Sequence, residues 1–431
     1  MPQMLSGGLR ASCLTLAAAL SSFSATSAET FLECKSRLTE QAVSEGVDRD
    51  TAQSVFAKLE YQPRVIELDR SQPEFVQTFP GYFSKRVTDW RVNKGKEMYA
   101  KHKDLLEQLN DKYGVPPHYL MAFWGLETNF GSYKGKMPVL DSLATLACDP
   151  RRATYFTQEL LVAIKLMQRE SLSQEDMVGS WAGAMGHTQF MPSAYTNYAV
   201  DGDGDGQANL WNSEADALTS AANFLANLGW KPGFRWGREI QLPENFDYRL
   251  SGYSNRRPVT AWNELGITKA NGEPLGEADI DAYVVVPAGH NGPAFLAYQN
   301  FRTIMRWNNS EFYAIAVGHL ADRIAGKPAL VADLPDLPAY SRDNIIALQQ
   351  ALNANGHDVG KPDGIIGPAT RAGIRDYQIA NGMIADGFPG LTVMASLGVE
   401  LAKDEESKEE SKVSSDEDAV KSGNTESEIK A

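Results

Sequence analysis

Apolar residues recur at helical spacing through most of the chain between residues 33 and 228, and this pattern predicts a mainly α fold. It predicts helices over 33–46, 48–58, 81–113, 117–130, 152–168, 174–179, 192–199 and 213–228. From Glu239 to Tyr298 the pattern changes to short β-rich runs separated by Gly, Pro and Asn. Helical spacing returns from Asn308 to Ile324. We therefore expect a helical body that carries a small β-containing subdomain.

Both ends of the chain differ in composition from this body. Residues 1–28 contain Arg10, an apolar stretch from Cys13 to Leu20 and small residues up to Ala28, the pattern of a cleaved signal peptide. Because that stretch is too short to span a bilayer, we expect an exported, periplasmic protein without stable membrane insertion. Residues 400–431 are rich in charge and poor in apolar side chains, which predicts a disordered acidic tail.

The length of 431 residues allows two or three domains, each with its own core. Residues 29–326 show no obvious linker and form the expected main domain. Residues 327–340 are rich in proline, as in an extended linker, and residues 341–399 form a separate compact module. The net charge of −14 argues against nucleic acid as a partner. We expect a monomer.

Two cysteines follow the predicted signal peptide, Cys34 and Cys148. In an oxidising compartment they can form a disulfide between the N-terminal helix and a later polar loop. Two separate buried thiols are the alternative.

One acid interrupts the most apolar predicted helix. Glu127 has Phe123, Trp124 and Phe130 as neighbours at helical spacing. Aromatic neighbours exclude water from a carboxyl group, which favours its neutral form and raises its pKa. A carboxyl group that is protonated near neutral pH can donate a proton to a glycosidic oxygen. The alternative is a helix glutamate whose carboxylate reaches solvent.

Three segments of the chain form distinctive motifs. They are Gly-Leu-Glu-Thr-Asn-Phe-Gly at 125–131, Gly179–Gly186 with Gln-Phe-Met-Pro-Ser at 189–193, and Pro-Ala-Gly-His-Asn-Gly-Pro-Ala-Phe at 287–295. Together these segments resemble the membrane-bound lytic transglycosylase B family. The resemblance covers Phe31 to Gly326. It implies a lysozyme-like catalytic domain over 29–326. It also implies non-hydrolytic cleavage of peptidoglycan between N-acetylmuramic acid and N-acetylglucosamine, which leaves a 1,6-anhydro end.

The same resemblance implies roles for single residues. Glu127 acts as the catalytic acid and then as the base. The implied substrate-binding residues are Ser180, Gln189, Asn308, Tyr313, Tyr82 and Tyr155. The chain departs from the family pattern at His187–Thr188, where we expect little consequence, and at Trp307, where tyrosine is frequent.

The expected mechanism uses one carboxylate. A glycosidase with two carboxylates needs a second acid about 5–9.5 Å from the first. The motif segments offer none, and Asp141 and Glu159, which follow in the sequence, fit packing or solvent roles. One acid suffices if the N-acetyl group stabilises the cation and the 6-hydroxyl of muramic acid attacks. A hydrolytic muramidase and a non-catalytic wall-binding scaffold are the alternatives.

An acidic loop follows Val200. Asp201, Asp203, Asp205 and Gln207 match the first ligand positions of a helix-loop-helix calcium loop. Asn212 stands where the bidentate glutamate is expected, and Asp216 or Glu214 can compensate. We expect structural Ca²⁺ here and no cofactor for catalysis; a solvated turn is the alternative.

The C-terminal segment resembles the peptidoglycan-binding domain 1 family over Tyr340 to Leu397. Its apolar spacing at Ile345, Leu348 and Leu352, followed by an Asp-Gly turn and a further helix, predicts a three-helix module. The resemblance implies that the module binds peptidoglycan strands and raises the local concentration of the catalytic domain. A helical spacer is the alternative.

Overall fold

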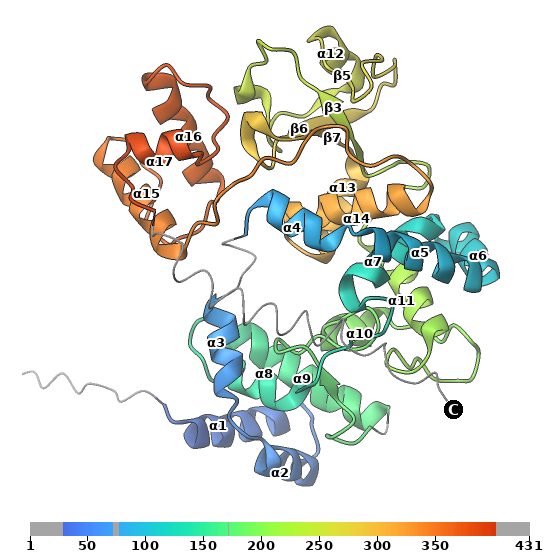
Figure 1. Cartoon of the computed structure of the whole chain (residues 1–431). Helices are drawn as coiled ribbons and strands as arrows, with labels where there is room; N and C mark the ends of the chain where they lie inside the picture. Colours follow the sequence, from blue (N-terminus) through green and yellow to red (C-terminus); the bar gives the residue numbers. More distant parts are fainter. Residues whose placement is uncertain (1–28, 72–76, 171, 402–431) are drawn as a thin grey trace, which may run out of the picture.

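The computed structural model describes residues 29–71, 77–170 and 172–401 (Figure 1). The predicted signal peptide and nearly all of the predicted acidic tail lie outside these residues. Helices dominate the described chain, so the predicted mainly α class is confirmed. Within the described residues, none of the helices has the length and apolarity that a membrane crossing requires.

An N-terminal helical unit has its own apolar core, which includes Leu38, Phe56, Leu143 and Phe156. Figure 1 shows this unit at the bottom of the molecule. Its helices are α1 (Phe31–Ser44), α2 (Arg49–Lys58), α3 (Pro63–Ser71), α8 (Val139–Ala147), α9 (Ala153–Arg169) and α10 (Pro192–Tyr198).

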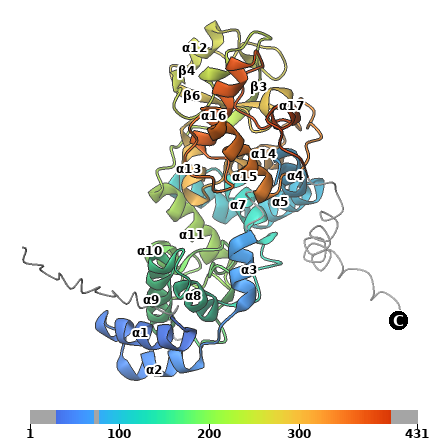
Figure 2. The ribbon, with the colours of Figure 1, turned by 90° about the vertical axis from the view of Figure 1, so that its left-hand side faces the viewer.

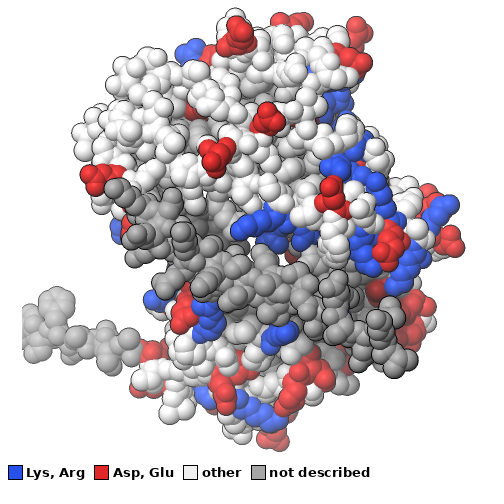
Figure 3. Space-filling view, in the orientation of Figure 1, with Lys and Arg blue, Asp and Glu red and all other residues white. Residues whose placement is uncertain are grey.

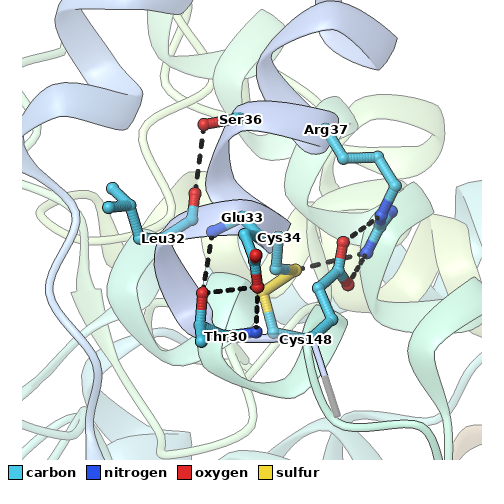
Figure 4. Close-up of polar contacts among 8 residues, drawn as sticks. Thr30, Leu32, Glu33, Cys34, Ser36, Arg37 and Cys148 are labelled. Carbon is cyan, nitrogen blue, oxygen red and sulfur yellow. Dashed lines mark hydrogen bonds and ion pairs between the residues drawn. A yellow bond between two sulfur atoms is a disulfide. The ribbon is translucent and has the colours of Figure 1, made fainter. Parts of the chain in front are cut away.

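A disulfide holds two distant segments of this unit together. Cys34 of α1 is bonded to Cys148 at the end of α8, with 5.9 Å between the Cα atoms and a sequence separation of 114 (Figure 4). One turn earlier, Thr30 and Glu33 form a reciprocal capping box that begins α1. The disulfide therefore attaches the capped N-terminal turn of α1 to the core of the unit.

A second helical unit surrounds α7 (Pro117–Thr128), most of whose residues are buried. The other helices are α4 (Phe79–Arg86), α5 (Asp89–Lys101), α6 (Lys103–Tyr113), α11 (Glu214–Asn227), α13 (Gln299–Trp307) and α14 (Glu311–Ile324). The Trp307 ring lies 4.6 Å from Phe123 of this core and 5.4 Å from Phe190 of the N-terminal core, measured between ring centroids. The two cores therefore meet at Trp307.

The β-rich region forms a five-stranded antiparallel sheet in the order β4-β6-β7-β3-β5. The strands are β3 (Gly237–Gln241), β4 (Arg257–Pro258), β5 (Thr268–Lys269), β6 (Asp281–Val285) and β7 (Ala294–Ala297). On β7, Phe295 packs into the helical core, while Leu296 packs into a separate core with Trp262 of α12 (Val259–Glu264). This alternation buries both faces of the sheet. A two-stranded sheet joins β1 (Met137–Pro138) to β2 (Val178–Gly179).

Three predicted helices are wrong in extent or type. The helix predicted over 81–113 is broken twice. Thr88 caps a new helix by accepting a hydrogen bond from the Arg91 N–H, and a second break at His102 separates α5 from α6. The segment 174–179 is a turn and a short strand, since Asp176 and Ser173 bond to each other instead of continuing a helix. The helix predicted to reach residue 130 ends at Thr128.

The C-terminal segment forms the predicted three-helix module, with α15 (Arg342–Ala354), α16 (Pro368–Ala380) and α17 (Leu391–Ser396) around one core. Figures 1 and 2 show it beside the sheet. The segment before it also lies on the sheet, because Glu239 of β3 accepts hydrogen bonds from the N–H groups of Val331 and Ala332. The expected extended linker is therefore held in place.

One buried carboxylate joins the module to the sheet subdomain. Asp386, whose side chain is 2% exposed, accepts a hydrogen bond of 2.9 Å from the His290 N–H, and its Oδ2 lies 2.6 Å from the His290 Nδ1. Its other oxygen accepts from Gln378 of the module. Gly289 allows this approach, because a Cβ there would stand 2.8 Å from the Asp386 Oδ2. The module therefore packs against the sheet subdomain through direct contacts, in addition to its covalent connection through residues 327–340.

We predict that His290→Ala loosens this docking. The substitution removes the ring contact with Asp386 and leaves the bond from Gln378 to Asp386 intact, so the module keeps its own fold. We expect a larger radius of gyration in small-angle scattering and faster proteolysis within residues 327–340. Gly289→Ala should act in the same direction, whereas the exposed Asn291→Ala should not. An unchanged scattering curve for both variants would contradict the docking role.

Candidate active site

Two hydrogen-bond donors fix the carboxyl group of Glu127. The Trp307 Nε1 donates to Glu127 Oε1 over 2.9 Å, and the Tyr313 hydroxyl donates to the same oxygen over 2.5 Å. Because both donors use Oε1, Oε2 is the atom that can carry a proton and donate it. Glu127 as a residue remains partly exposed, so it is not sealed in the core.

Burial dominates the electrostatics of this group. Loss of water raises the pKa of Glu127 to about 7, against the opposing effects of the Tyr313 and Trp307 hydrogen bonds and the positive charge of Arg86. Burial and the neighbouring Glu127 hold the pKa of Tyr313 well above its ordinary value, so its hydroxyl stays a donor. Near neutral pH Glu127 therefore has both the acid and the base form available.

A left-handed turn follows Glu127 immediately. Asn129, Phe130 and Gly131 have φ angles of 49°, 60° and 82°, a conformation that is uncommon for a bulky residue such as Phe130. The turn folds the Phe130 ring back onto Gly125, where a Cβ would stand 2.7 Å from the ring. At Gly131 a Cβ would stand 2.2 Å from the His187 ring. Both glycines of the motif are therefore needed for side chains to approach the helix end.

His187 joins the end of α7 to the segment that contains Ser180 and Gln189. Its carbonyl accepts a hydrogen bond of 2.7 Å from the Thr128 hydroxyl, and its Nδ1 accepts one of 3.1 Å from the Trp124 Nε1. Burial lowers the pKa of His187 to about 4, which keeps the ring neutral and able to accept. The expectation of little consequence at His187–Thr188 stays a prediction, although the local motif did not show that His187 accepts a hydrogen bond from Trp124.

The segment from Gly179 to Gln189 is a compact turn. The Ala184 N–H donates to the Ser180 Oγ over 3.0 Å, and the Gln189 side-chain amide donates to the Gly186 carbonyl over 3.0 Å. A Cβ at Gly179 would stand 2.2 Å from the Ala184 oxygen, so only glycine fits there. Ser180 and Gln189 are both partly exposed, which leaves their polar atoms near the surface of a rigid turn.

The remaining expected residues differ in their relation to Glu127. Tyr82 is buried and carries the Arg86 guanidinium 5.4 Å above its ring, and Arg86 acts on the Glu127 charge. Asn308 is exposed and directly follows Trp307. Tyr155 is 48% exposed on α9, and no contact between described side chains connects it to Glu127.

Sequence reasoning missed two contributors to this site. It noted Trp307 only as an aromatic position, although an indole N–H is a donor and can stabilise a carboxylate. It gave Arg86 no role, because nothing in the local sequence relates α4 to α7. Lys85 and Arg86 form the basic last turn of α4, and Figure 3 shows Lys and Arg side chains over this part of the molecule.

The acidic loop gathers three of its five expected metal ligands. Oxygens of Asp201, Asp203 and Asp205 lie within 4.8 Å of one another. Backbone N–H groups of Gly206 and Gly204 donate to Asp201 and lower its pKa, so the loop favours the charged carboxylate. The side chain of Gln207 is exposed, and its N–H donates to Asp205, which leaves its carbonyl as the expected ligand.

Asp216 has a different place from the one expected. It is fully buried, and its two oxygens accept hydrogen bonds from the N–H groups of Gly202 and Asn209. Glu214, the other expected substitute, pairs with Lys101 and His102. Asp216 therefore braces the two ends of the loop, and neither acid lies in the cluster of three.

We predict that Trp307→Phe raises the pKa of Glu127 above about 7. The variant keeps an aromatic ring but loses the donor to Oε1, which stabilises the carboxylate; loss of a hydrogen bond to a charged group corresponds to roughly one pH unit or more. Carbon NMR titration of the glutamate carboxyls measures the shift. Trp262→Phe is the matched control, because it removes an indole donor to a backbone carbonyl in the sheet subdomain. An unchanged or lowered pKa would show that Trp307 does not stabilise the charge.

Two family models match the chain. Residues 30–322 match the transglycosylase SLT domain, and residues 341–397 match the putative peptidoglycan binding domain. The chain is 32% identical over 295 residues to the membrane-bound lytic murein transglycosylase B of Escherichia coli K12. The alignment covers 65% of this chain and 79% of that protein.

Two solved structures are similar to this one. SltB3 from Pseudomonas aeruginosa in complex with NAG-anhNAM-pentapeptide is 42% identical, with a TM-score of 0.81 and coverage of 86% of this chain and 99% of that chain. The Escherichia coli lytic transglycosylase Slt35 in complex with calcium is 31% identical, with a TM-score of 0.60 and coverage of 68% and 92%. The chain therefore belongs to the membrane-bound lytic transglycosylase B family, as a peptidoglycan lytic transglycosylase with a C-terminal peptidoglycan-binding module.

Proposed function

We propose that this enzyme cleaves the bond between N-acetylmuramic acid and N-acetylglucosamine without water and leaves a 1,6-anhydro end, with Glu127 as its only catalytic carboxyl group. The observation that carries the proposal is a glutamate with a pKa of about 7 whose Oε1 is fixed and whose Oε2 remains available. A relative at 42% identity has been solved with an anhydro-muramyl ligand, which supports the same product class.

The reaction proceeds in two proton transfers. The Glu127 Oε2–H donates its proton to the glycosidic oxygen as the bond to C1 breaks, and N-acetylglucosamine leaves with a new hydroxyl. The N-acetyl group of muramic acid stabilises the cation at C1. The Glu127 carboxylate then removes the proton from the 6-hydroxyl, whose oxygen bonds to C1. Glu127 ends protonated, so no water is consumed.

Two acids that follow Glu127 in the sequence have other roles, which supports a single catalytic acid. Asp141 accepts a hydrogen bond of 2.6 Å from the Glu60 N–H. Glu159 accepts from the N–H and the hydroxyl of Ser193. Both carboxylates are buried and committed to holding segments together, so neither is free to activate a water molecule.

The glycan strand is proposed to contact the exposed polar groups around Glu127. Ser180 and Gln189 present theirs from the rigid turn, and Asn308 presents its amide beside Trp307. Tyr82 and Tyr155 are proposed as further substrate contacts. The docked C-terminal module binds the same polymer. We further propose that the enzyme acts as a monomer in the periplasm.

We predict that Glu127→Gln abolishes cleavage of purified peptidoglycan, because the amide cannot donate a proton of comparable acidity. The exposed Glu97→Gln is the control and should keep wild-type activity. Mass spectrometry of the wild-type digest should give anhydro-muramyl products. Products heavier by one water would identify a hydrolase, and retained activity in Glu127→Gln would remove Glu127 from the mechanism.

We also propose that the loop with Asp201, Asp203 and Asp205 binds Ca²⁺ in a structural role. The three oxygens within 4.8 Å offer the hard ligands that calcium prefers. A related structure was solved in complex with calcium. The ion would hold the loop between α10 and α11 and would neutralise three adjacent negative charges. Because neither Asp216 nor Glu214 supplies a bidentate ligand, we expect weak binding.

We predict that millimolar Ca²⁺ raises the melting temperature of the protein, since a ligand that binds only the folded state stabilises it. Asp203→Asn should remove most of this increase, whereas Asp279→Asn, which lies in the sheet subdomain, should retain it. A melting temperature that does not respond to Ca²⁺ or to chelation would reject the site.

A further inference from the structure

We propose that Arg91 is a positioning residue for Glu127, because its guanidinium caps the C-terminal ends of α7 and α4 together and so sets Arg86 against the catalytic carboxyl group. The inference rests on the proposed role of Glu127. It concerns a residue outside the catalytic motifs, on a third helix, α5.

The first cap lies at the end of α7. The last carbonyl groups of a helix have no partner within the helix. The Arg91 Nε donates to the Gly125 carbonyl over 3.1 Å, and its Nη2 donates to the Asn129 Oδ1 over 2.6 Å. Asn129 is the first residue of the left-handed turn after Glu127. Arg91 therefore bonds to a backbone carbonyl before the catalytic residue and to a side chain after it.

The second cap lies at the end of α4. The Arg91 Nη1 donates to the Lys85 carbonyl over 2.9 Å and to the Arg86 carbonyl over 2.6 Å. These are the last two carbonyl groups of α4. One planar guanidinium thus serves two helix ends, a geometry that the ammonium group of lysine does not offer.

The stability of α5 does not explain an arginine at this position. Arg91 lies in the first turn of α5, where its N–H donates to Thr88, and a cation is unfavourable near the positive end of a helix dipole. Arg91 is also only 8% exposed, and burial of a charge is costly without compensation. The negative ends of α7 and α4 supply that compensation.

The double cap has an electrostatic consequence at Glu127. Arg86, whose carbonyl Arg91 holds, projects over the Tyr82 ring and lowers the pKa of Glu127. The other titratable group against Glu127 is Tyr313, and Tyr82 acts on Tyr313. A loosened α4 end would weaken the effect of Arg86, so the pKa of Glu127 would rise.

The test is the pH dependence of kcat for the full-length enzyme on soluble glycan fragments. Arg91→Lys should lower kcat roughly ten- to a hundredfold, since small displacements of a catalytic group are costly, while KM changes much less. The alkaline limb should move to higher pH, because the acid form of Glu127 persists longer. Arg86→Gln should move it in the same direction. The double variant should move it no further than Arg86→Gln alone, since both changes remove one effect.

Substitutions at Asn129 guard against a simple folding defect. Asn129→Gly suits the φ of 49° and removes the acceptor for Arg91, whereas Asn129→Asp keeps an acceptor. We expect Asn129→Gly to show the same loss in kcat as Arg91→Lys, and Asn129→Asp to keep most of the wild-type kcat. The exposed Arg49→Lys controls for the arginine-to-lysine change itself.

Two results would overturn the positioning role. One is a lower melting temperature in Arg91→Lys and Asn129→Gly with unchanged kcat and pH profile. The other is shifts of Arg91→Lys and Arg86→Gln that simply add. Failure of the proposed function has a separate signature, because Glu127→Gln would then remain active whatever the Arg91 variants do.

Discussion

The structure depends on keeping one carboxyl group partly dehydrated where two apolar cores meet. Glu127 is raised from its ordinary pKa of 4.5 to about 7, which corresponds to roughly 3 kcal/mol in favour of the protonated form. Since the folded-state pKa is the higher one, this contribution is fully present below pH 4.5 and is lost as the pH rises through about 7. At alkaline pH the folded protein therefore carries an unfavourable buried charge. The surrounding contacts must offset that charge, and the Trp307 and Tyr313 donors do so in part.

The same constraint explains why the helix that carries Glu127 ends abruptly. If the helix continued, the Phe130 side chain would point away from the helix end and could not reach Gly125. The left-handed turn instead returns its ring to Gly125 and leaves Thr128 free to bond to His187. The unusual backbone of Phe130 is offset by polar contacts with two other segments, since Arg91 of α5 bonds to Asn129 and His187 bonds to the end of α7. Most residues of the motif around Glu127 therefore fix the end of α7, and Glu127 itself is the reactive group.

Local pattern predicts what depends on local physics. The apolar helix around Glu127, the raised pKa of that acid, the acidic loop and the three-helix module all follow from spacing and residue type. Relations between distant segments do not. Neither the burial of Asp216 against Gly202 nor the contact between His187 and Trp124 has a local signature, because each partner is chosen by packing. The predicted helix over 81–113 fails in its first part for a local reason, since the capping Thr88 begins a new helix despite continuous apolar spacing.

Buried polar side chains connect separate elements of this enzyme, both within one helical unit and between subdomains. Arg91 joins helices within the second helical unit, and Asp386 joins the C-terminal module to the sheet subdomain. An apolar contact between such units would tolerate sliding, because dispersion and burial have little directional preference. A hydrogen-bonded charge in a buried site tolerates little, since displacement leaves a desolvated group without its partners. The enzyme therefore combines apolar cores, whose contacts have little directional preference, with directional polar contacts. The contact of Asp386 with His290 sets the position of the peptidoglycan-binding module against the sheet subdomain, and the contacts of Arg91 set the helix end that carries Glu127.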